Sequence, residues 1–207
     1  MIKILGRPTS SNVQKVLWCA GELGIDFEHE AEYGGPHGKV DEPEYFALNP
    51  NRTVPTLIQD EFVLWESNSI VRYLASVYGA GNMWPTENKA RANAERWMDW
   101  HQMNLDELLF PPFFELVRVP AEQRNMEVID NAVVETKPKF AILDAQLAEH
   151  SFVAGDELTI ADIALGPGVN RWLGLPIERI SFPNVEDWYA RMKQRPAFAK
   201  YVDIPFS

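Results

Sequence analysis

The stretch NRTVPTLIQDEFVLWES, residues 51–67, decides the fold of the first part of this chain. Two β-prone runs, residues 56–58 and residues 62–65, flank the polar segment Gln59-Asp60-Glu61. Runs of this kind separated by a short polar segment are typical of an antiparallel hairpin. A helical pattern begins directly afterwards, so the stretch predicts a hairpin that leads into a helix.

Both ends of this hairpin carry features of a ligand site. Pro55 cannot donate a hydrogen bond to a sheet, so the backbone of Val54 can stay unpaired and accept a peptide-like ligand as an added strand. Ser67 lies where a helix N-terminus is expected, and the free amides there attract a carboxylate. A ligand with a peptide backbone and a nearby carboxylate would satisfy both features. The same residues are also explained without a ligand, as an edge-strand marker and an N-cap.

The residues before the hairpin predict alternating strands and helices. Residues 2–5 and 27–33 are β-prone, and apolar residues recur at helical spacing between positions 13 and 20. Residues 43–48 can form one or two helical turns. A strand-helix-strand start favours a parallel pair, to which the hairpin adds antiparallel strands. The sequence therefore predicts an α/β domain with a four-stranded mixed sheet and helices packed on it.

A break in the pattern at residues 79–82 suggests two domains, residues 1–80 and residues 86–207. No convincing strand pattern occurs from residue 86 onward, so the second domain is expected to be all-helical. Thr86 is expected to cap its first helix. Thr159 and Asp162 have the spacing of a capping box at the start of another helix.

Prolines set the expected helix ends in the second domain. Pro111 and Pro112 are expected to end or sharply bend the first long helix. Pro120 is expected at the start of a long helix towards residue 150, and Pro138 to kink or break that helix. Pro196 is expected to close the last helix.

Composition excludes several function classes. The formal net charge of −11 argues against binding to nucleic acid or to an anionic membrane. A single cysteine, Cys19, cannot form an internal disulfide, which favours a reducing compartment. No apolar stretch approaches membrane-spanning length and the first residues are strand-like, so a cytoplasmic location is expected. The four histidines are scattered, and no metal site is expected. Positive groups that could attract an anionic ligand are Arg7, Lys15, Lys39, Arg52 and Arg72.

Four motifs in order resemble those of the glutathione transferases, of the bacterial theta/phi-like kind. They are GRPTSSNVQKVLW at residues 6–18, LNPNRTVPTL at 48–57, LWESNSIVRYL at 64–74 and TIADI at 159–163. Each motif alone is weak, but together they span essentially the whole chain. The resemblance implies a thioredoxin-like N-terminal domain, a helical C-terminal domain, and an enzyme that uses glutathione as co-substrate without a metal.

The resemblance also implies how glutathione would bind. Pro55 would be the cis-proline of the thioredoxin-like fold, and Val54 would pair its backbone with the cysteinyl part. Glu66 and Ser67 would hold the γ-glutamyl end. The implied glutathione-binding residues are Asn12, Lys39, Val40, Arg52, Val54, Pro55, Glu66 and Ser67, with Lys39, the Val40 backbone and Arg52 at the glycine end.

The catalytic donor is expected in the loop before the first helix. By alignment with the family pattern, Ser10 occupies the position of the hydroxyl that hydrogen-bonds the glutathione sulfur. A donor to sulfur favours the thiolate over the thiol and so lowers the pKa of the thiol. Thr9, Ser11 and Asn12 remain alternatives, and Ser11 or Asn12 could instead cap the helix. Cys19 lies within the helix and is expected to be a buried structural thiol.

The second substrate is expected to bind between the domains. Candidate pocket residues are Met103, Phe110, Phe113, Phe114 and Trp172. If they line the pocket, the substrate is a small hydrophobic or aromatic electrophile, although apolar residues at helical spacing also belong to cores. The predicted function is glutathione transfer in detoxification by a cytoplasmic homodimer. Alternatives are glutathione-dependent reduction of peroxides or disulfides, and a non-catalytic binding or interaction protein of the same fold.

Overall fold

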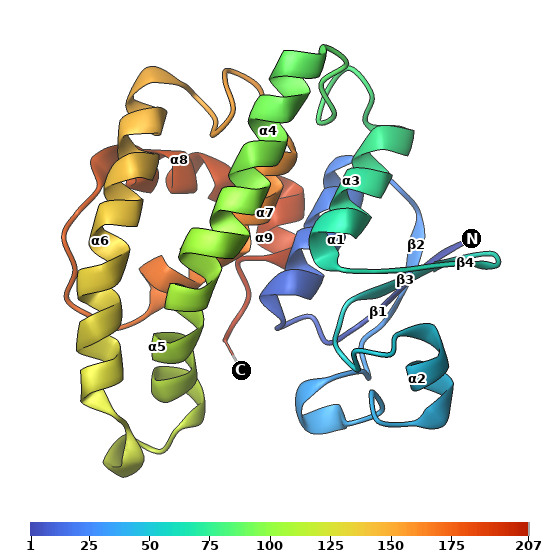
Figure 1. Cartoon of the computed structure of the whole chain (residues 1–207), viewed down its shortest axis with the longest axis horizontal. Helices are drawn as coiled ribbons and strands as arrows, with labels where there is room; N and C mark the ends of the chain where they lie inside the picture. The colour runs from blue at the N-terminus through green and yellow to red at the C-terminus, as the bar shows by residue number, and fades with distance from the viewer. Residues whose placement is uncertain (207) are drawn as a thin grey trace.

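A four-stranded sheet forms one half of the molecule (Figure 1). The computed structural model describes residues 1–206 of the chain. The strands are β1 (Ile2–Leu5), β2 (Phe27–Glu30), β3 (Thr56–Gln59) and β4 (Phe62–Trp65), in the order β2-β1-β3-β4. β1 pairs parallel with β2 and antiparallel with β3, and β3 forms the hairpin with β4. The predicted mixed sheet and its hairpin are therefore confirmed, although β2 ends at Glu30, earlier than expected.

Helices connect and cover these strands. α1 (Ser11–Glu22) links β1 to β2, and α3 (Ser67–Tyr78) follows β4. A 3-10 turn (Gly35–His37) and the short helix α2 (Pro43–Leu48) lie in the connection between β2 and β3. α1 and α3 pack side by side, so the sheet half buries a shared apolar face between them.

The other half contains helices and loops, apart from one isolated bridge, in the part of the chain that the structure describes. The helices are α4 (Asn88–His101), a π-helical segment (Gln102–Asp106), α5 (Glu107–Arg118), a 3-10 turn (Ala121–Gln123), α6 (Met126–Glu149), α7 (Ile160–Gly174), α8 (Pro183–Lys193) and α9 (Pro196–Tyr201). No helix within residues 1–206 is long and apolar enough to cross a membrane.

α7 is the central helix that joins the two halves. Almost all of its side chains are buried, and it packs against α1 on one side and α4 on another. Gly166 permits the close approach, because a Cβ at this position would come within 2.4 Å of the Trp18 ring. Trp18 also packs edge-on against Phe198, with 4.8 Å between ring centroids. The core is therefore continuous from the sheet half into the helical half.

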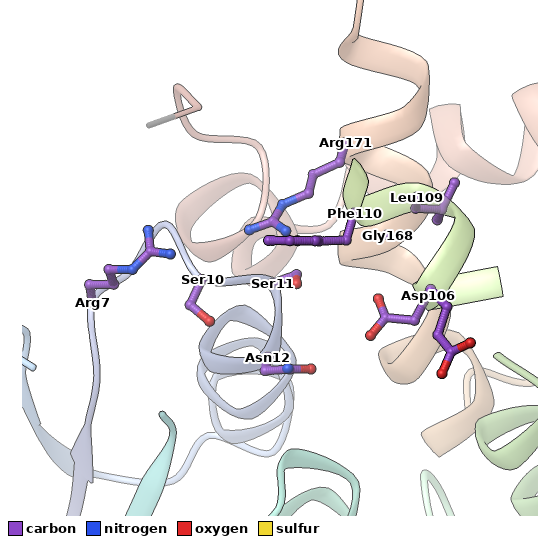
Figure 2. A pocket seen from close by; sticks show the side chains of 10 residues that line it. Arg7, Ser10, Ser11, Asn12, Asp106, Leu109, Phe110, Gly168 and Arg171 are labelled. Carbon is purple, nitrogen blue, oxygen red and sulfur yellow. The ribbon is translucent and has the colours of Figure 1, made fainter. Parts of the chain in front are cut away.

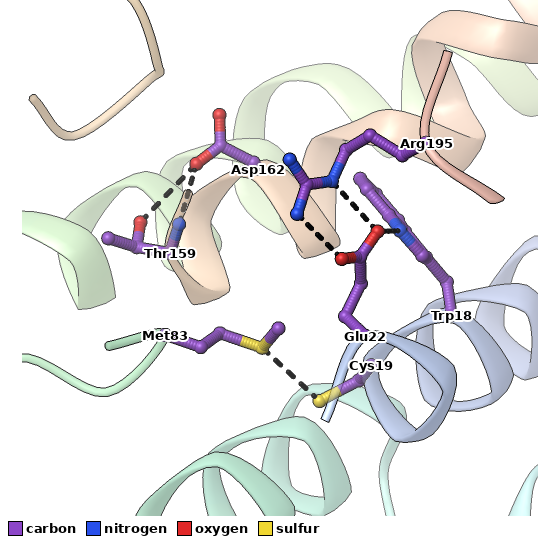
Figure 3. A network of polar contacts seen from close by, with 7 residues as sticks. All are labelled: Trp18, Cys19, Glu22, Met83, Thr159, Asp162 and Arg195. Atoms are coloured by element: carbon purple, nitrogen blue, oxygen red, sulfur yellow. Dashed lines mark hydrogen bonds and ion pairs between the residues drawn. The ribbon is translucent and has the colours of Figure 1, made fainter. Parts of the chain in front are cut away.

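Polar contacts fix the same junction (Figure 3). The Glu22 carboxylate accepts hydrogen bonds from Arg195 Nε at 2.8 Å, Arg195 Nη2 at 2.7 Å and Trp18 Nε1 at 2.8 Å. The predicted capping box is present, since Asp162 Oδ2 accepts from the Thr159 backbone N–H at 3.0 Å. The Glu22–Arg195 contacts join α1 to the start of α9, and the capping box fixes the start of α7.

Cys19 is fully buried in this core, as expected. Its Sγ lies 3.7 Å from Met83 Sδ. Burial raises the pKa of the Cys19 thiol well above its usual range. The thiol is therefore held in its unreactive, protonated form.

Several expected helix ends were wrong. Glu87 rather than Thr86 is the N-cap of α4, and its carboxylate accepts from the Ala90 N–H at 2.8 Å. Pro111 and Pro112 do not end a helix but lie inside α5, directly after the π-helical segment where the backbone already departs from α-geometry.

The remaining prolines also do not mark the helix ends that the sequence predicted. Pro120 precedes a 3-10 turn, and the long helix α6 begins at Met126 with Asn125 as its N-cap. α6 continues through Pro138 without a break. Pro196 starts the short helix α9 instead of closing α8, which is favourable because a first-turn N–H has no helical partner to lose.

Candidate functional site

A cavity of about 430 Å³ opens between the loop before α1 and the helices α5 and α7 (Figure 2). Its lining residues are Arg7, Ser10, Ser11, Asn12, Asp106, Glu107, Leu109, Phe110, Gly168 and Arg171. The cavity thus lies between the sheet half and the helical half, where the second-substrate site was expected. The wall contains more polar than apolar residues.

Ser10 supplies a free hydroxyl to this cavity. It is the N-cap of α1 with an extended backbone, and its carbonyl accepts from the Gln14 N–H at 2.8 Å. Its side chain makes no capping hydrogen bond, and no partner for Oγ is found within residues 1–206. The interpretation of Ser11 or Asn12 as the cap is wrong, because both lie inside the first turn of α1. Ser10 is therefore the cap residue by position, with its donor unused.

Asn12 is fixed by two neighbours. Its Oδ1 accepts from Lys15 Nζ at 3.0 Å and from Ser67 Oγ at 3.1 Å. Because a lysine ammonium can only donate, the amide oxygen must face Lys15, which orients the side-chain NH₂ the other way. That NH₂ has no hydrogen-bond partner in the part of the chain that the structure describes. Asn12 therefore ties the start of α1 to the start of α3 and keeps a donor free.

Lys15 and His101 are buried close to this network. Lys15 is 2% exposed, and burial lowers its pKa against the opposing effect of Asp106. His101 is completely buried, and neither ring nitrogen has a partner within residues 1–206. Burial, reinforced by the charge of Lys15, lowers the pKa of His101 to about 3. His101 Nε2 lies so near Gly168 that a Cβ there would approach it to 2.8 Å.

The backbone of Val54 is unpaired, as expected. The Val54-Pro55 peptide bond is cis, and no hydrogen bond to the Val54 N–H or C=O is found within residues 1–206. The preceding turn is held by side chains that the sequence analysis did not assign. Tyr45 Oη and Asn49 Nδ2 both donate to the Thr53 carbonyl, at 2.5 Å and 2.9 Å. Residues 48–57 therefore present one free strand edge on a rigid support.

Glu66 and Ser67 form the N-terminus of α3. Glu66, rather than Ser67, is the N-cap, and its φ of 71° lies in the left-handed region. Such a conformation is costly for a residue with a side chain and is concentrated at ligand sites. Ser67 is the first helical residue and is 8% exposed. Its position beside Asn12 brings the α3 amides next to the α1 loop.

The residues expected at the glycine end lie in surface loops. Lys39 pairs with Glu32, and Arg52 Nη1 lies 3.5 Å from Asp41 Oδ1. Val40 donates its N–H to the Gly38 carbonyl at 2.5 Å. Exposed ion pairs of this kind are weak, so a bound anion can compete for these cations.

Only one of the five expected electrophile-pocket residues lines the cavity, and that is Phe110. Phe113 is buried beneath Arg171, whose Cζ lies 4.1 Å from the ring centroid. Phe114 and Met103 are exposed, at 42% and 71%. Trp172 stacks on Phe140 in a separate hollow. Helical periodicity placed these side chains on helices but not on the face that meets the cavity.

Asp106 and Arg171 line the cavity and were missed by sequence reasoning. Arg171 Nη2 donates to the Thr9 carbonyl at 2.8 Å, which connects α7 to the loop before α1. The signal was present: Arg171 is a charged residue near the end of a mostly apolar, buried helix. No group of three or more His, Cys, Asp or Glu side chains in the described ranges is placed to hold a metal ion.

Comparison with known proteins defines the class. Residues 9–77 match the family model "Glutathione S-transferase, N-terminal domain", and residues 107–196 match "Glutathione S-transferase, C-terminal domain". The chain belongs to the glutathione S-transferase family. The expected fold class and the expected function class, glutathione transferase, are thereby confirmed.

Individual relatives are similar over their full length. The chain is 39% identical to glutathione S-transferase GstB of Escherichia coli over 209 residues, covering 100% of both. It is 40% identical to a theta class glutathione S-transferase of Xanthomonas axonopodis pv. citri, whose crystal structure has glutathione bound. That match has a TM-score of 0.96 and covers 100% of this chain and 99% of the other. Glutathione S-transferase 3 of Zea mays is 30% identical, with 97% and 93% covered.

Proposed function

We propose that this transferase binds glutathione along the free edge at Val54, with the γ-glutamyl end at Glu66 and Ser67. The observation that carries the proposal is the unpaired Val54 backbone, which can form two ladder hydrogen bonds with a cysteinyl residue. The α3 N-terminus offers free amides to the γ-glutamyl carboxylate. Glu66 can accept from the ligand's ammonium. Pro55 shapes the edge, and Lys39, Val40 and Arg52 lie on the loops proposed to meet the glycine carboxylate.

The proposed chemistry is attack by the glutathione thiolate. Ser10 Oγ would donate to the sulfur and so stabilise the thiolate over the thiol. The N-terminus of α1 adds a favourable dipole at the same place. The sulfur then attacks an electrophilic carbon, a carbon–sulfur bond forms, and the leaving group departs with its bonding electrons. The side-chain NH₂ of Asn12 is a second free donor at this site and remains the alternative to Ser10.

A binding experiment tests the glutathione site. Calorimetry on Ser67→Ala should show glutathione binding weakened by about 10- to 100-fold, the range expected for one lost hydrogen bond to a charged group. Ser69→Ala is the matched control, because Ser69 is exposed on the same helix. Equal affinities for the two variants would place the γ-glutamyl end elsewhere.

We propose further that the chain works as a cytoplasmic homodimer that detoxifies small electrophiles. A dimer is supported by exposed apolar residues where α3 ends, Val77 and Tyr78, and by a hollow beside Trp97 and Trp100 on α4. Sedimentation equilibrium measures the assembly directly. A monomer at micromolar concentration would contradict this part of the proposal.

A further inference from the structure

The second-substrate side of the cavity carries a buried positive charge that has no ion-pair partner within residues 1–206. Arg171 projects from near the end of α7 and is 8% exposed. It makes no ion pair within residues 1–206. Its contacts with the chain are the hydrogen bond from Nη2 to the Thr9 carbonyl and the stacking of its guanidinium on the Phe113 ring, with 4.1 Å between Cζ and the ring centroid.

The other nitrogens of the Arg171 guanidinium have no polar partner in the described residues. Nε and Nη1 have no hydrogen-bond partner in the described residues, and neither belongs to the fully buried unpaired atoms of the structure. Since Arg171 lines the cavity, these N–H groups are available to a ligand bound there. In Figure 2 the Arg171 side chain extends from α7 towards the loop that carries Ser10 and Ser11.

Burial and the neighbouring arginines disfavour the charged form of Arg171. The pKa of Arg171 is lowered to about 10, mainly by burial and further by Arg7 and Arg118, against the opposing effect of Asp106. A buried charge is costly unless it is paired. A neutral donor could also make the hydrogen bond to the Thr9 carbonyl. That bond therefore does not explain why a charged guanidinium is buried at this position. A bidentate oxyanion would use the two free donors.

We propose that Arg171 forms an anion subsite, so that this transferase prefers an aromatic electrophile that carries a carboxylate. Phe110 would stack on the ring of such a substrate while Arg171 binds its carboxylate, with the reactive carbon towards Ser10. This inference rests on the proposed transfer reaction and narrows its substrate class. It also revises the expectation of a purely hydrophobic electrophile.

Two matched probes test the subsite, a chlorodinitrobenzoate and the corresponding chlorodinitrobenzamide. In both reactions the glutathione sulfur bonds to the ring carbon and chloride leaves with the electron pair. Each kcat/KM is divided by the uncatalysed rate constant with free glutathione, which removes the difference in intrinsic reactivity. The quantity of interest is the ratio of the acid to the amide.

Arg171→Gln should lower this ratio by at least about tenfold, because the lost contact is a hydrogen-bonded charge pair. Arg191→Gln is the control, since Arg191 donates one similar bond, from Nη2 to the Ser151 carbonyl at 2.7 Å, on the exposed surface. This control should leave the ratio within about twofold. An unchanged ratio in folded Arg171→Gln would overturn the subsite, whereas turnover of the amide by the unmodified enzyme would still support the transferase function.

A second measurement needs no variant. The chlorine-free dinitrobenzoate should bind the glutathione-loaded enzyme at least about tenfold more tightly than dinitrobenzamide. This preference should fall as salt concentration rises. Equal affinities would overturn the subsite even if Arg171→Gln did not fold. Failure of both chlorinated probes to react, with a normal preference for the acid in binding, would contradict the transfer reaction and leave the subsite supported.

Discussion

Replacing Ser10 by alanine tests the proposed thiolate donor, and its effect can be worked out from the contacts. Ser10 Oγ has no partner within residues 1–206 and makes no capping bond, so the variant should lose little stability. A hydrogen bond from the hydroxyl to a charged sulfur is worth about 1.5–3 kcal/mol, which raises the thiol pKa by about 1–2 units when it is removed.

Two effects of that shift oppose each other. Below the pKa, the thiolate fraction falls about tenfold for each unit of the shift. The less stabilised thiolate is more nucleophilic, with a Brønsted coefficient of about 0.4–0.5. The net loss in kcat/KM near neutral pH is therefore roughly 3- to 10-fold, smaller than the thiolate fraction alone suggests. Above the pKa, the variant should be as fast as the unmodified enzyme or faster.

The assay is the pH profile of kcat/KM with a chlorodinitrobenzene. Ser10→Ala should move the acid limb of the profile upward in pH by about 1–2 units, while Ser11→Ala should leave it in place. Glutathione affinity should change less than turnover. A profile that moves with Asn12→Ala and not with Ser10→Ala would refute the assignment and transfer the role to the Asn12 amide.

Three further predictions concern buried groups. His101 has a pKa of about 3 when folded and an ordinary value of about 6.5 when unfolded, so the unfolded chain gains a proton first as pH falls. The free energy of unfolding should therefore decrease by about 2–3 kcal/mol between neutral pH and pH of about 4.5 because of this group. Chemical denaturation of His101→Leu should show a pH dependence that is smaller by that amount. Cys19 should resist a thiol reagent in the native protein and react once on unfolding. Asp162→Ala should lower the free energy of unfolding by about 3–5 kcal/mol, because Trp188 Nε1, at 2.9 Å, and two backbone N–H groups would lose a buried acceptor.

Each of these predictions has a contradicting result. A pH dependence that is the same in His101→Leu would mean that the imidazole is protonated or hydrated in the native state. Rapid labelling of native Cys19 would mean that α1 opens locally at low cost. A loss of less than about 1 kcal/mol in Asp162→Ala would mean that water replaces the carboxylate.

The sheet half was predictable because its signals are local. The residues that form the hairpin and those that form α2 are adjacent in the sequence, and their alternation and turn composition are sufficient to define them. Pro55 and the N-terminus of α3 were located for the same reason. The family resemblance, and not the spacing, supplied the roles of Ser10 and Lys39.

The cavity wall was not predictable, since it depends on how helices far apart in the sequence meet. Phe110, Phe113 and Phe114 lie on the same helix, but only the packing of α5 against α7 decides that Phe110 lines the cavity and Phe113 is buried. The π-helical segment before α5 changes which face of α5 turns towards the cavity. No pattern of residues in the sequence predicts this segment. Arg171 could have been found from its charge within a mostly apolar helix.

The most direct test of the central claim is a spectroscopic titration of glutathione bound to the enzyme. The ultraviolet absorption of the thiolate should appear with an apparent pKa at least about one unit below the value of about 8.5 for a free thiol, and Ser10→Ala should move it back towards that value. A bound thiol that titrates like the free one, or no binding at millimolar glutathione, would contradict the account.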